Sequence, residues 1–67
     1  MAGDYVYRMS VGDYDCVLTD DKDYSPDGRR VLVDLDSQCV FGYNQLLEVY
    51  DPKLERMLRK AGYTNVV

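Results

Sequence analysis

The sequence predicts a small α+β domain, in which a three- to four-stranded antiparallel sheet is covered on one face by one or two C-terminal helices. The chain has 67 residues, which allows a single domain over 1–67, because so short a chain has too little core to divide. Hydrophobic residues make up 46% and charged residues 30% of the chain, as in ordinary globular proteins. Strand-like alternation occupies the first half and a helical pattern occupies the last quarter, which gives the order of strands followed by helix.

The first two strands are predicted to form a tight hairpin. Residues 4–11 and 14–19 both alternate between the two sides of a strand, and only Gly12-Asp13 separates them. Glycine accepts the positive φ that a type II′ turn requires at its first central residue. A two-residue turn pairs Val11 with Tyr14 and brings the apolar sides of both strands together. The two strands are therefore expected to turn a shared apolar face toward the core.

A third strand is predicted over residues 30–36, where a continuous apolar run is followed by alternation. The sequence of residues 25–28, Ser-Pro-Asp-Gly, is the strongest turn signal in the chain. Proline suits the first central position of a type I turn, and glycine tolerates positive φ. A four-residue loop at 25–28 pairs Leu18 with Leu35, and this register is expected to keep Leu35 on the core face.

The next segment is ambiguous, and residues 38–43 are left without an assignment. Cys39-Val40-Phe41 is typical of a short buried strand, whereas Gly42 could end that strand or lie in a first helical turn. Residues 44–50 are a candidate for a short helix with Asn44 as its N-cap. Whether the domain has one helix or two depends on this segment.

A helix that begins after Asp51 has stronger support. Asp51 supplies a capping carboxylate, Pro52 suits the first helical position, and Gly62 suits the left-handed residue that ends a helix. Apolar residues recur at i, i+3, i+4 and i+7 and form one stripe, made of Leu54, Met57, Leu58 and Ala61. Residues 63–67 are expected to fold back on the core through Tyr63, Val66 and Val67. Three tyrosines are expected to pack between helix and sheet, namely Tyr43, Tyr50 and Tyr63.

Charge and composition exclude most kinds of functional chemistry. Twelve acidic residues, ten of them Asp, against eight basic ones give a net charge of −4, which disfavours direct binding to nucleic acid. The absence of His removes the commonest near-neutral acid/base group, and two Cys cannot complete a four-cysteine zinc site. Asp21, Asp23 and Ser25 imitate the opening of a calcium loop, but Pro26 stands where that loop requires glycine. We therefore expect no enzymatic activity, no cofactor and no metal.

Cysteine usage and the start of the chain predict a reducing compartment. Cys16 and Cys39 are expected to be buried reduced thiols, with a single disulfide as the alternative. Residues 1–7 lack both the basic region and the apolar run of a secretory signal. No apolar run approaches the roughly 20 residues that span a bilayer. The expectation is a cytoplasmic protein that does not bind membranes.

The predicted registers gather aspartates on the sheet face opposite the core. We call this surface the acidic face, and its members are Asp4, Asp15, Asp21, Asp23, Asp34 and Asp36. Successive carboxylates on one strand face stand about 6.5–7 Å apart, a spacing comparable to that of phosphates along a nucleic acid. Tyr24 lies among acids beside the predicted turn and is a candidate aromatic anchor. The acidic face predicts recognition of a basic groove, and the alternative is a solvated face that only resists aggregation.

A short α+β chain that is acidic, rich in Asp and Tyr and without His resembles the small phage-encoded inhibitors, among them anti-CRISPR proteins and DNA mimics. The resemblance rests on the charge layout of residues 4–36. It implies a monomeric inhibitor, cytoplasmic in a bacterial host, which docks its acidic face on a basic nucleic-acid-binding surface of a protein target such as a CRISPR effector subunit. The expected partner-binding residues are Asp15, Asp20, Asp21, Asp23, Tyr24, Asp27, Asp34 and Asp36. The alternative function is a structural or regulatory interaction subunit that packs through its apolar, Tyr-rich side and uses its acids only for solubility.

Overall fold

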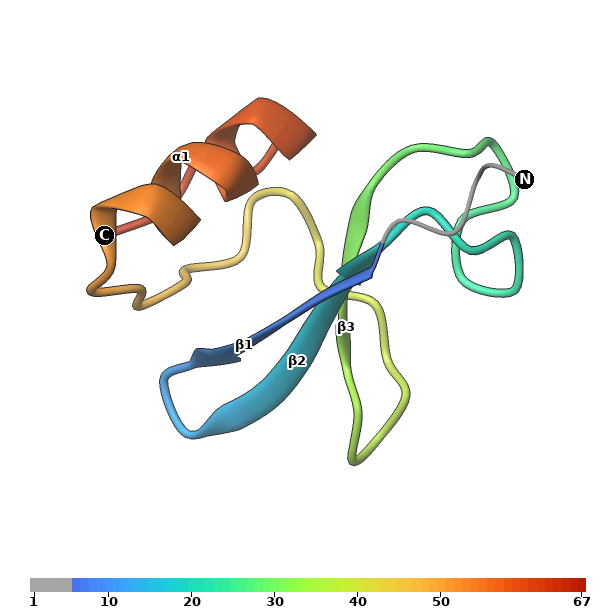
Figure 1. Cartoon of the computed structure of the whole chain (residues 1–67), viewed down its shortest axis with the longest axis horizontal. Helices are drawn as coiled ribbons and strands as arrows, with labels where there is room; N and C mark the ends of the chain where they lie inside the picture. The colour runs from blue at the N-terminus through green and yellow to red at the C-terminus, as the bar shows by residue number, and fades with distance from the viewer. Residues whose placement is uncertain (1–5) are drawn as a thin grey trace.

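A computed structural model, which describes residues 6–67, contains a three-stranded antiparallel sheet and one helix (Figure 1). The strands are β1 (Val6–Val11), β2 (Tyr14–Thr19) and β3 (Val31–Asp34), and the helix is α1 (Pro52–Ala61). Strand β2 lies between β1 and β3 in the sheet. The predicted small α+β fold with a C-terminal helix is confirmed. The first two residues of the predicted first strand, 4 and 5, lie outside the described residues.

The β1–β2 hairpin has the predicted register. Val11 pairs with Tyr14, and Gly12 takes a φ of +59° in the turn between them. Met9 and Leu18, which share one face of the hairpin, are buried in the hydrophobic core. Turn chemistry and apolar alternation specify the same pairing here, and for this reason the local sequence was sufficient to predict it.

The register between β2 and β3 differs from the prediction. Leu18 pairs with Leu32 and not with Leu35, a shift of three residues that exchanges the two faces of β3. Leu32 therefore reaches the core, while Val31 and Val33 face the other side of the sheet. All three are buried, and a continuous apolar run is typical of a strand that is covered on both faces.

The connection between these strands explains the shift. Residues 20–30 form turns of their own instead of lengthening both strands. The Ser25 N–H donates to the Asp21 carbonyl at 2.8 Å, and the Gly28 N–H donates to the Ser25 carbonyl at 3.0 Å. Gly28 has the positive φ, +79°, that the turn signal predicted. The turn is thus correctly placed, but it lies inside a longer loop, and the expected four-residue connection is wrong.

After β3 the chain returns along the free edge of that strand. It turns at residues 35–37, and β3 ends at Asp34, two residues before the predicted end. The Asp34 N–H donates to the Cys39 carbonyl and the Phe41 N–H donates to the Leu32 carbonyl, both at 2.9 Å. The segment that the sequence left unassigned therefore adds a short strand-like stretch beside β3.

Residues 44–50 do not form the predicted short helix. The segment is extended, because Leu47 forms a parallel bridge with Val66 and the Val49 N–H donates to the Val67 carbonyl at 2.8 Å. Leu47 and Val49 are buried and the residues around them are exposed, which is the period of a strand and not of a helix. Val66 is buried as expected, whereas Val67 is exposed and that part of the prediction is wrong.

Helix α1 forms where it was predicted. The Asp51 carboxylate accepts a hydrogen bond from the Lys53 N–H at 2.9 Å, and Gly62 takes a φ of +115° at the C-cap. Leu58 is buried in the core, and the rest of the apolar stripe packs partly buried against it. The helix covers the sheet face that carries Leu18. No helix of residues 6–67 has the length and apolar character needed to cross a membrane.

Tyr63 joins several parts of the core. Its ring is 1% exposed, and its hydroxyl accepts a hydrogen bond from the Leu32 N–H at 2.7 Å and donates to the Phe41 carbonyl at 3.2 Å. The hydroxyl thus bridges β3 and the returning segment. Tyr43 packs against the Tyr63 ring with centroids 4.7 Å apart, as expected for packing between helix and sheet. Tyr50 is 84% exposed, so the same expectation is wrong for that residue.

Candidate functional site

The predicted partner-binding residues lie at two opposite ends of the sheet. Asp15 is the second residue of β2 and Asp20 directly follows the last, so the two are separated by about 17 Å at 3.4 Å per residue. Asp34 and Asp36 lie at the end near Asp15, because Asp34 pairs with Cys16. The other predicted residues share the loop at the far end, namely Asp20, Asp21, Asp23, Tyr24 and Asp27.

The acidic face is not continuous even at one end of the sheet. Asp34 pairs with Cys16 and therefore lies on the core side, where it is 8% exposed. Asp15 lies on the other side and forms an ion pair with Arg8, whose Nε donates to Asp15 Oδ1 at 3.1 Å. This hydrogen bond lowers the pKa of the Asp15 carboxyl and raises the pKa of the Arg8 guanidinium. The prediction of one coherent acidic face is wrong, because the three-residue register shift moved Asp34 across the sheet.

In the loop at the far end, the side chains of Asp21 and Asp27 stabilise the turns. Asp21 Oδ1 accepts a hydrogen bond from the Asp23 N–H at 3.0 Å. Asp27 Oδ1 accepts hydrogen bonds from the Ser25 hydroxyl at 3.1 Å and from the Arg29 N–H at 3.2 Å. These bonds, first of all the one from the backbone of Arg29, lower the pKa of Asp27. Local turn chemistry therefore accounts for part of the Asp excess in this loop.

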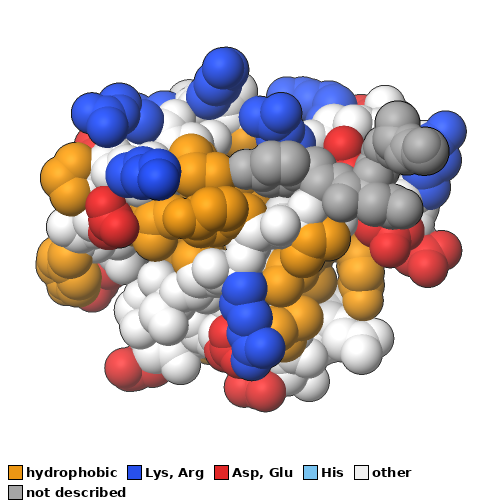
Figure 2. All heavy atoms as spheres, viewed as in Figure 1, with side chains coloured by type: hydrophobic (Ala, Val, Ile, Leu, Met, Phe, Trp, Pro, Cys, Tyr) orange, Lys and Arg blue, Asp and Glu red, His pale blue; other side chains and the backbone are white. Residues whose placement is uncertain are grey.

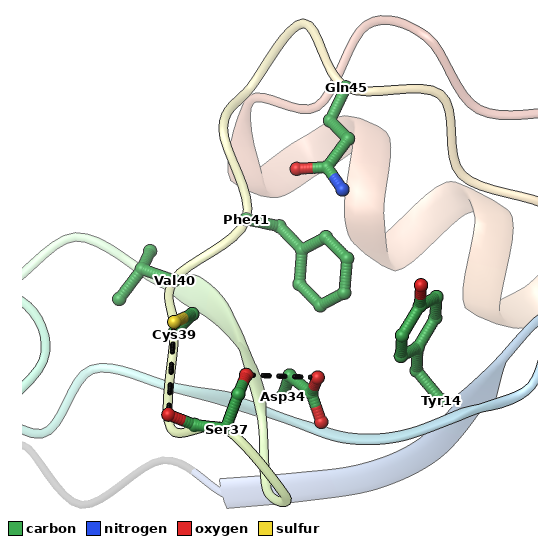
Figure 3. Close-up of a pocket in the computed structure, with 7 residues that line it drawn as sticks. All are labelled: Tyr14, Asp34, Ser37, Cys39, Val40, Phe41 and Gln45. Carbon is green, nitrogen blue, oxygen red and sulfur yellow. Dashed lines mark hydrogen bonds between the residues drawn. The ribbon is translucent and has the colours of Figure 1, made fainter.

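A concave surface lies at the end of the sheet that carries the β1–β2 turn. Two adjoining hollows, of about 320 and 220 Å³, share Tyr14, Phe41 and Gln45. We call the two together the Tyr14 hollow and the larger one the Asp34 pocket. The Asp34 pocket is lined by Tyr14, Asp34, Ser37, Cys39, Val40, Phe41 and Gln45 (Figure 3). The smaller hollow adds Val11, Gly12, Asp13, Leu46, Leu47 and Glu48.

Aromatic rings form two sides of the Asp34 pocket. The rings of Tyr14 and Phe41 meet edge to face, with centroids 5.9 Å apart and an interplanar angle of 74°. Tyr14 is 52% exposed, although the sequence placed it on the core side, because it stands at the strand end beyond the cover of α1. Leu46 is also exposed in the smaller hollow, whereas the exposed side chain of Val40 points away from the two rings (Figure 3). The hollow therefore presents apolar surface to a partner.

The Asp34 carboxylate lies at the base of the pocket, below the two rings (Figure 3). Its Oδ1 accepts a hydrogen bond from the Asp36 N–H and its Oδ2 accepts one from the Ser37 hydroxyl, both at 3.0 Å. Within residues 6–67, no Lys or Arg forms an ion pair with this carboxylate. Asp34 is thus a nearly buried acidic group that is held by hydrogen bonds but is not neutralised by a described cation.

The electrostatic field at this end of the sheet is negative. Burial is the main cause that raises the pKa of the Cys16 thiol to about 11, and repulsion from Asp34, Asp15 and Asp36 adds to it. Cys16 is a buried free thiol, as predicted, whereas Cys39 is free but exposed, so the prediction of a buried thiol is wrong for Cys39. Among the described residues, no His, Cys, Asp and Glu side chains form a group of three or more that could hold a metal.

Basic residues gather elsewhere on the molecule. Lys53, Arg56 and Lys60 are exposed on α1, and Lys60 borders a third hollow with Arg29 and Arg30. Figure 2 shows Lys and Arg side chains over the helix, along one edge of the molecule. The domain therefore has a basic helix edge and an acidic, aromatic hollow.

Sequence reasoning named Asp34 but missed the residues around it. Tyr14 was assigned to the core, Phe41 lies in the segment that was left unassigned, and Gln45 lies in the segment expected to form a short helix. The position of Tyr14 directly after a two-residue turn could have indicated its exposure, because a single short helix does not easily cover a strand end.

Comparison of the chain with models of protein families, with curated proteins and with solved structures finds no match.

Proposed function

We propose that this protein is a small protein-binding module that contacts its partner through the Tyr14 hollow. The observation that carries the proposal is the grouping of exposed Tyr14 and Leu46 with the acidic Asp34, Asp13 and Glu48 around one concavity. Aromatic anchors beside a pocket, surrounded by polar groups, are typical of the residues that dominate binding energy in protein interfaces.

Charge supports a partner with a basic surface. The net charge of −4 and the acids in and around the Tyr14 hollow would steer a cationic surface toward that end of the sheet. If the partner's basic surface normally binds nucleic acid, occupation by this protein would block it and make the protein a stoichiometric inhibitor. This is the role that the sequence resemblance implies, with an aromatic hollow as the contact in place of a broad acidic face.

The structural or regulatory subunit remains the second candidate, because the exposed apolar side chains favour it. Val40, Leu46 and Tyr50 are 45%, 56% and 84% exposed. A subunit that packs through these side chains would bind mainly by burying apolar area, which salt does not screen. Binding steered by acids would weaken as salt rises toward about 0.5 M NaCl, because exposed charges are screened at short distances there.

The test begins with capture of partners from a bacterial lysate by the whole chain, followed by affinity measurement with each purified partner. Tyr14→Ala should lower the affinity for the true partner about tenfold or more, because it removes an exposed aromatic anchor. Asp23→Asn removes one charge in the loop at the far end of the sheet and serves as the comparison. If Asp23→Asn weakens binding and Tyr14→Ala does not, the loop is the contact and the proposal fails.

A further inference from the structure

We infer that the Asp34 pocket receives an arginine side chain of the partner, with the guanidinium on the Asp34 carboxylate and its flat face against an aromatic ring. This inference rests on the proposed function, since it names the group that the Tyr14 hollow would recognise. Size, hydrogen-bonding capacity and ring geometry each support it.

The volume suits one side chain. At about 320 Å³ the pocket lies at the lower end of the roughly 300–1,000 Å³ range of small-molecule sites, and it is open to solvent on one side. A long side chain that projects from a partner surface can enter such an opening. A helix or a sheet edge is too wide for it, so the pocket is suited to a single projecting residue.

The Asp34 carboxylate can accept further hydrogen bonds. Each of its oxygens accepts one hydrogen bond, from the Asp36 N–H or from the Ser37 hydroxyl, and each carboxylate oxygen has two acceptor positions. No described residue uses the second position on either oxygen, and the side chain lines the pocket. A guanidinium presents two parallel N–H groups in a fixed geometry that matches two carboxylate oxygens. The ammonium of lysine lacks this geometry.

The aromatic rings favour the same ligand. A guanidinium stacks on the faces of aromatic rings and is attracted by their negative π faces. Tyr14 and Phe41 meet edge to face, so they present differently directed surfaces to the pocket, and Tyr14 is half exposed. The negative field at this end of the sheet opposes anionic side chains and attracts cationic ones. A purely apolar side chain would leave the carboxylate without a cation.

The experiment is an NMR titration of the 15N-labelled whole chain with N-acetyl-L-arginine amide. Two probes of similar size serve for comparison: N-acetyl-L-citrulline amide, which is neutral, and N-acetyl-L-lysine amide, which is charged but has no planar group. We expect saturable shifts at the amides of Ser37, Cys39 and Phe41, with at least about threefold tighter binding of the arginine probe than of either comparison. Equal binding of the citrulline probe, or shifts located elsewhere, would overturn the inference.

Variants separate the contributions of the charge and the ring. Asp34→Asn should weaken binding of the arginine probe about tenfold, and Tyr14→Leu should weaken it several-fold. Glu55→Gln, which removes one charge on α1, should leave binding of the probe unchanged. The amide spectrum of each variant establishes its fold, and Tyr14→Leu tests the inference independently if Asp34→Asn unfolds. If no arginine probe binds but the partner still requires Tyr14, the docking proposal stands and the arginine inference is wrong. If neither probe binding nor partner binding depends on Asp34 and Tyr14, the docking proposal and the arginine inference are both wrong.

Discussion

The substitution Tyr63→Phe tests how the returning segment is held beside β3. The Tyr63 hydroxyl is placed between two strands, where it accepts from the Leu32 N–H at 2.7 Å and donates to the Phe41 carbonyl at 3.2 Å. Removing the oxygen leaves both backbone groups without this partner in a buried region. Each buried polar group that loses its hydrogen bond costs about 1–3 kcal/mol, and two groups are affected here. Partial closure of the gap would recover some of this cost. We expect the free energy of unfolding to fall by about 2–4 kcal/mol.

This loss is large for so small a chain. At about 0.05–0.15 kcal/mol per residue, 67 residues give a total stability of about 3–10 kcal/mol. Urea unfolding monitored by circular dichroism measures the change, and with a slope of about 1 kcal/mol/M the midpoint should fall by about 2 M or more. Tyr50→Phe is the matched control, because Tyr50 is 84% exposed and, among residues 6–67, its hydroxyl donates only to the Glu48 carboxylate, at 3.2 Å. A Tyr63→Phe protein as stable as the Tyr50→Phe protein would refute the bridging role.

Two further predictions concern the thiol and the helix cap. Unfolding exposes Cys16, and the pKa of its thiol falls from about 11 to its ordinary 9.0. Between these two pH values the thiol loses its proton in the unfolded state but keeps it in the folded state. The free energy of unfolding should therefore fall by about 2–3 kcal/mol as pH rises from 9 to 11. Cys16→Ala should remove that part of the pH dependence, and identical slopes in both proteins would contradict the assignment. Gly62→Ala should lower the unfolding free energy by at least about 1 kcal/mol, because φ is +115° and the new Cβ would lie 3.2 Å from both Tyr43 and Arg29. Gly42→Ala, where a Cβ meets nothing within 4 Å, should be nearly neutral in the same denaturation assay, and equal losses in both variants would count against the cap.

The elements predicted correctly are those whose signals are local. The β1–β2 hairpin follows from a two-residue turn that leaves only one register consistent with the apolar pattern. Helix α1 follows from caps at both ends, Asp51 and Gly62, together with an apolar stripe. In both cases the information lies within one short continuous segment, residues 6–19 for the hairpin and 51–62 for the helix, and no distant contact overrides it.

The elements predicted wrongly depend on distant pairing. The Ser-Pro-Asp-Gly turn exists, but nothing local shows that a second turn at Asp21 precedes it and shifts β3 by three residues. Residues 44–50 have a capping signal at their start, yet pairing with the C-terminal segment keeps them extended. Each error changed the candidate site: the first moved Asp34 to the core side, and the second placed Gln45 and Leu46 beside Tyr14.

The placement of Asp34 gives a way to tell a binding residue from a structural one. A nearly buried carboxylate without a described cation is costly, and its two hydrogen bonds only partly offset the loss of water. An asparagine could keep both contacts, because its oxygen accepts from the Asp36 N–H and its amide can donate to the Ser37 hydroxyl. If Asp34 serves only the turn, Asp34→Asn should leave partner affinity unchanged. If it serves binding, the variant should be at least as stable as the original protein in urea and yet bind its partner more weakly, because proteins retain destabilising groups where function requires them.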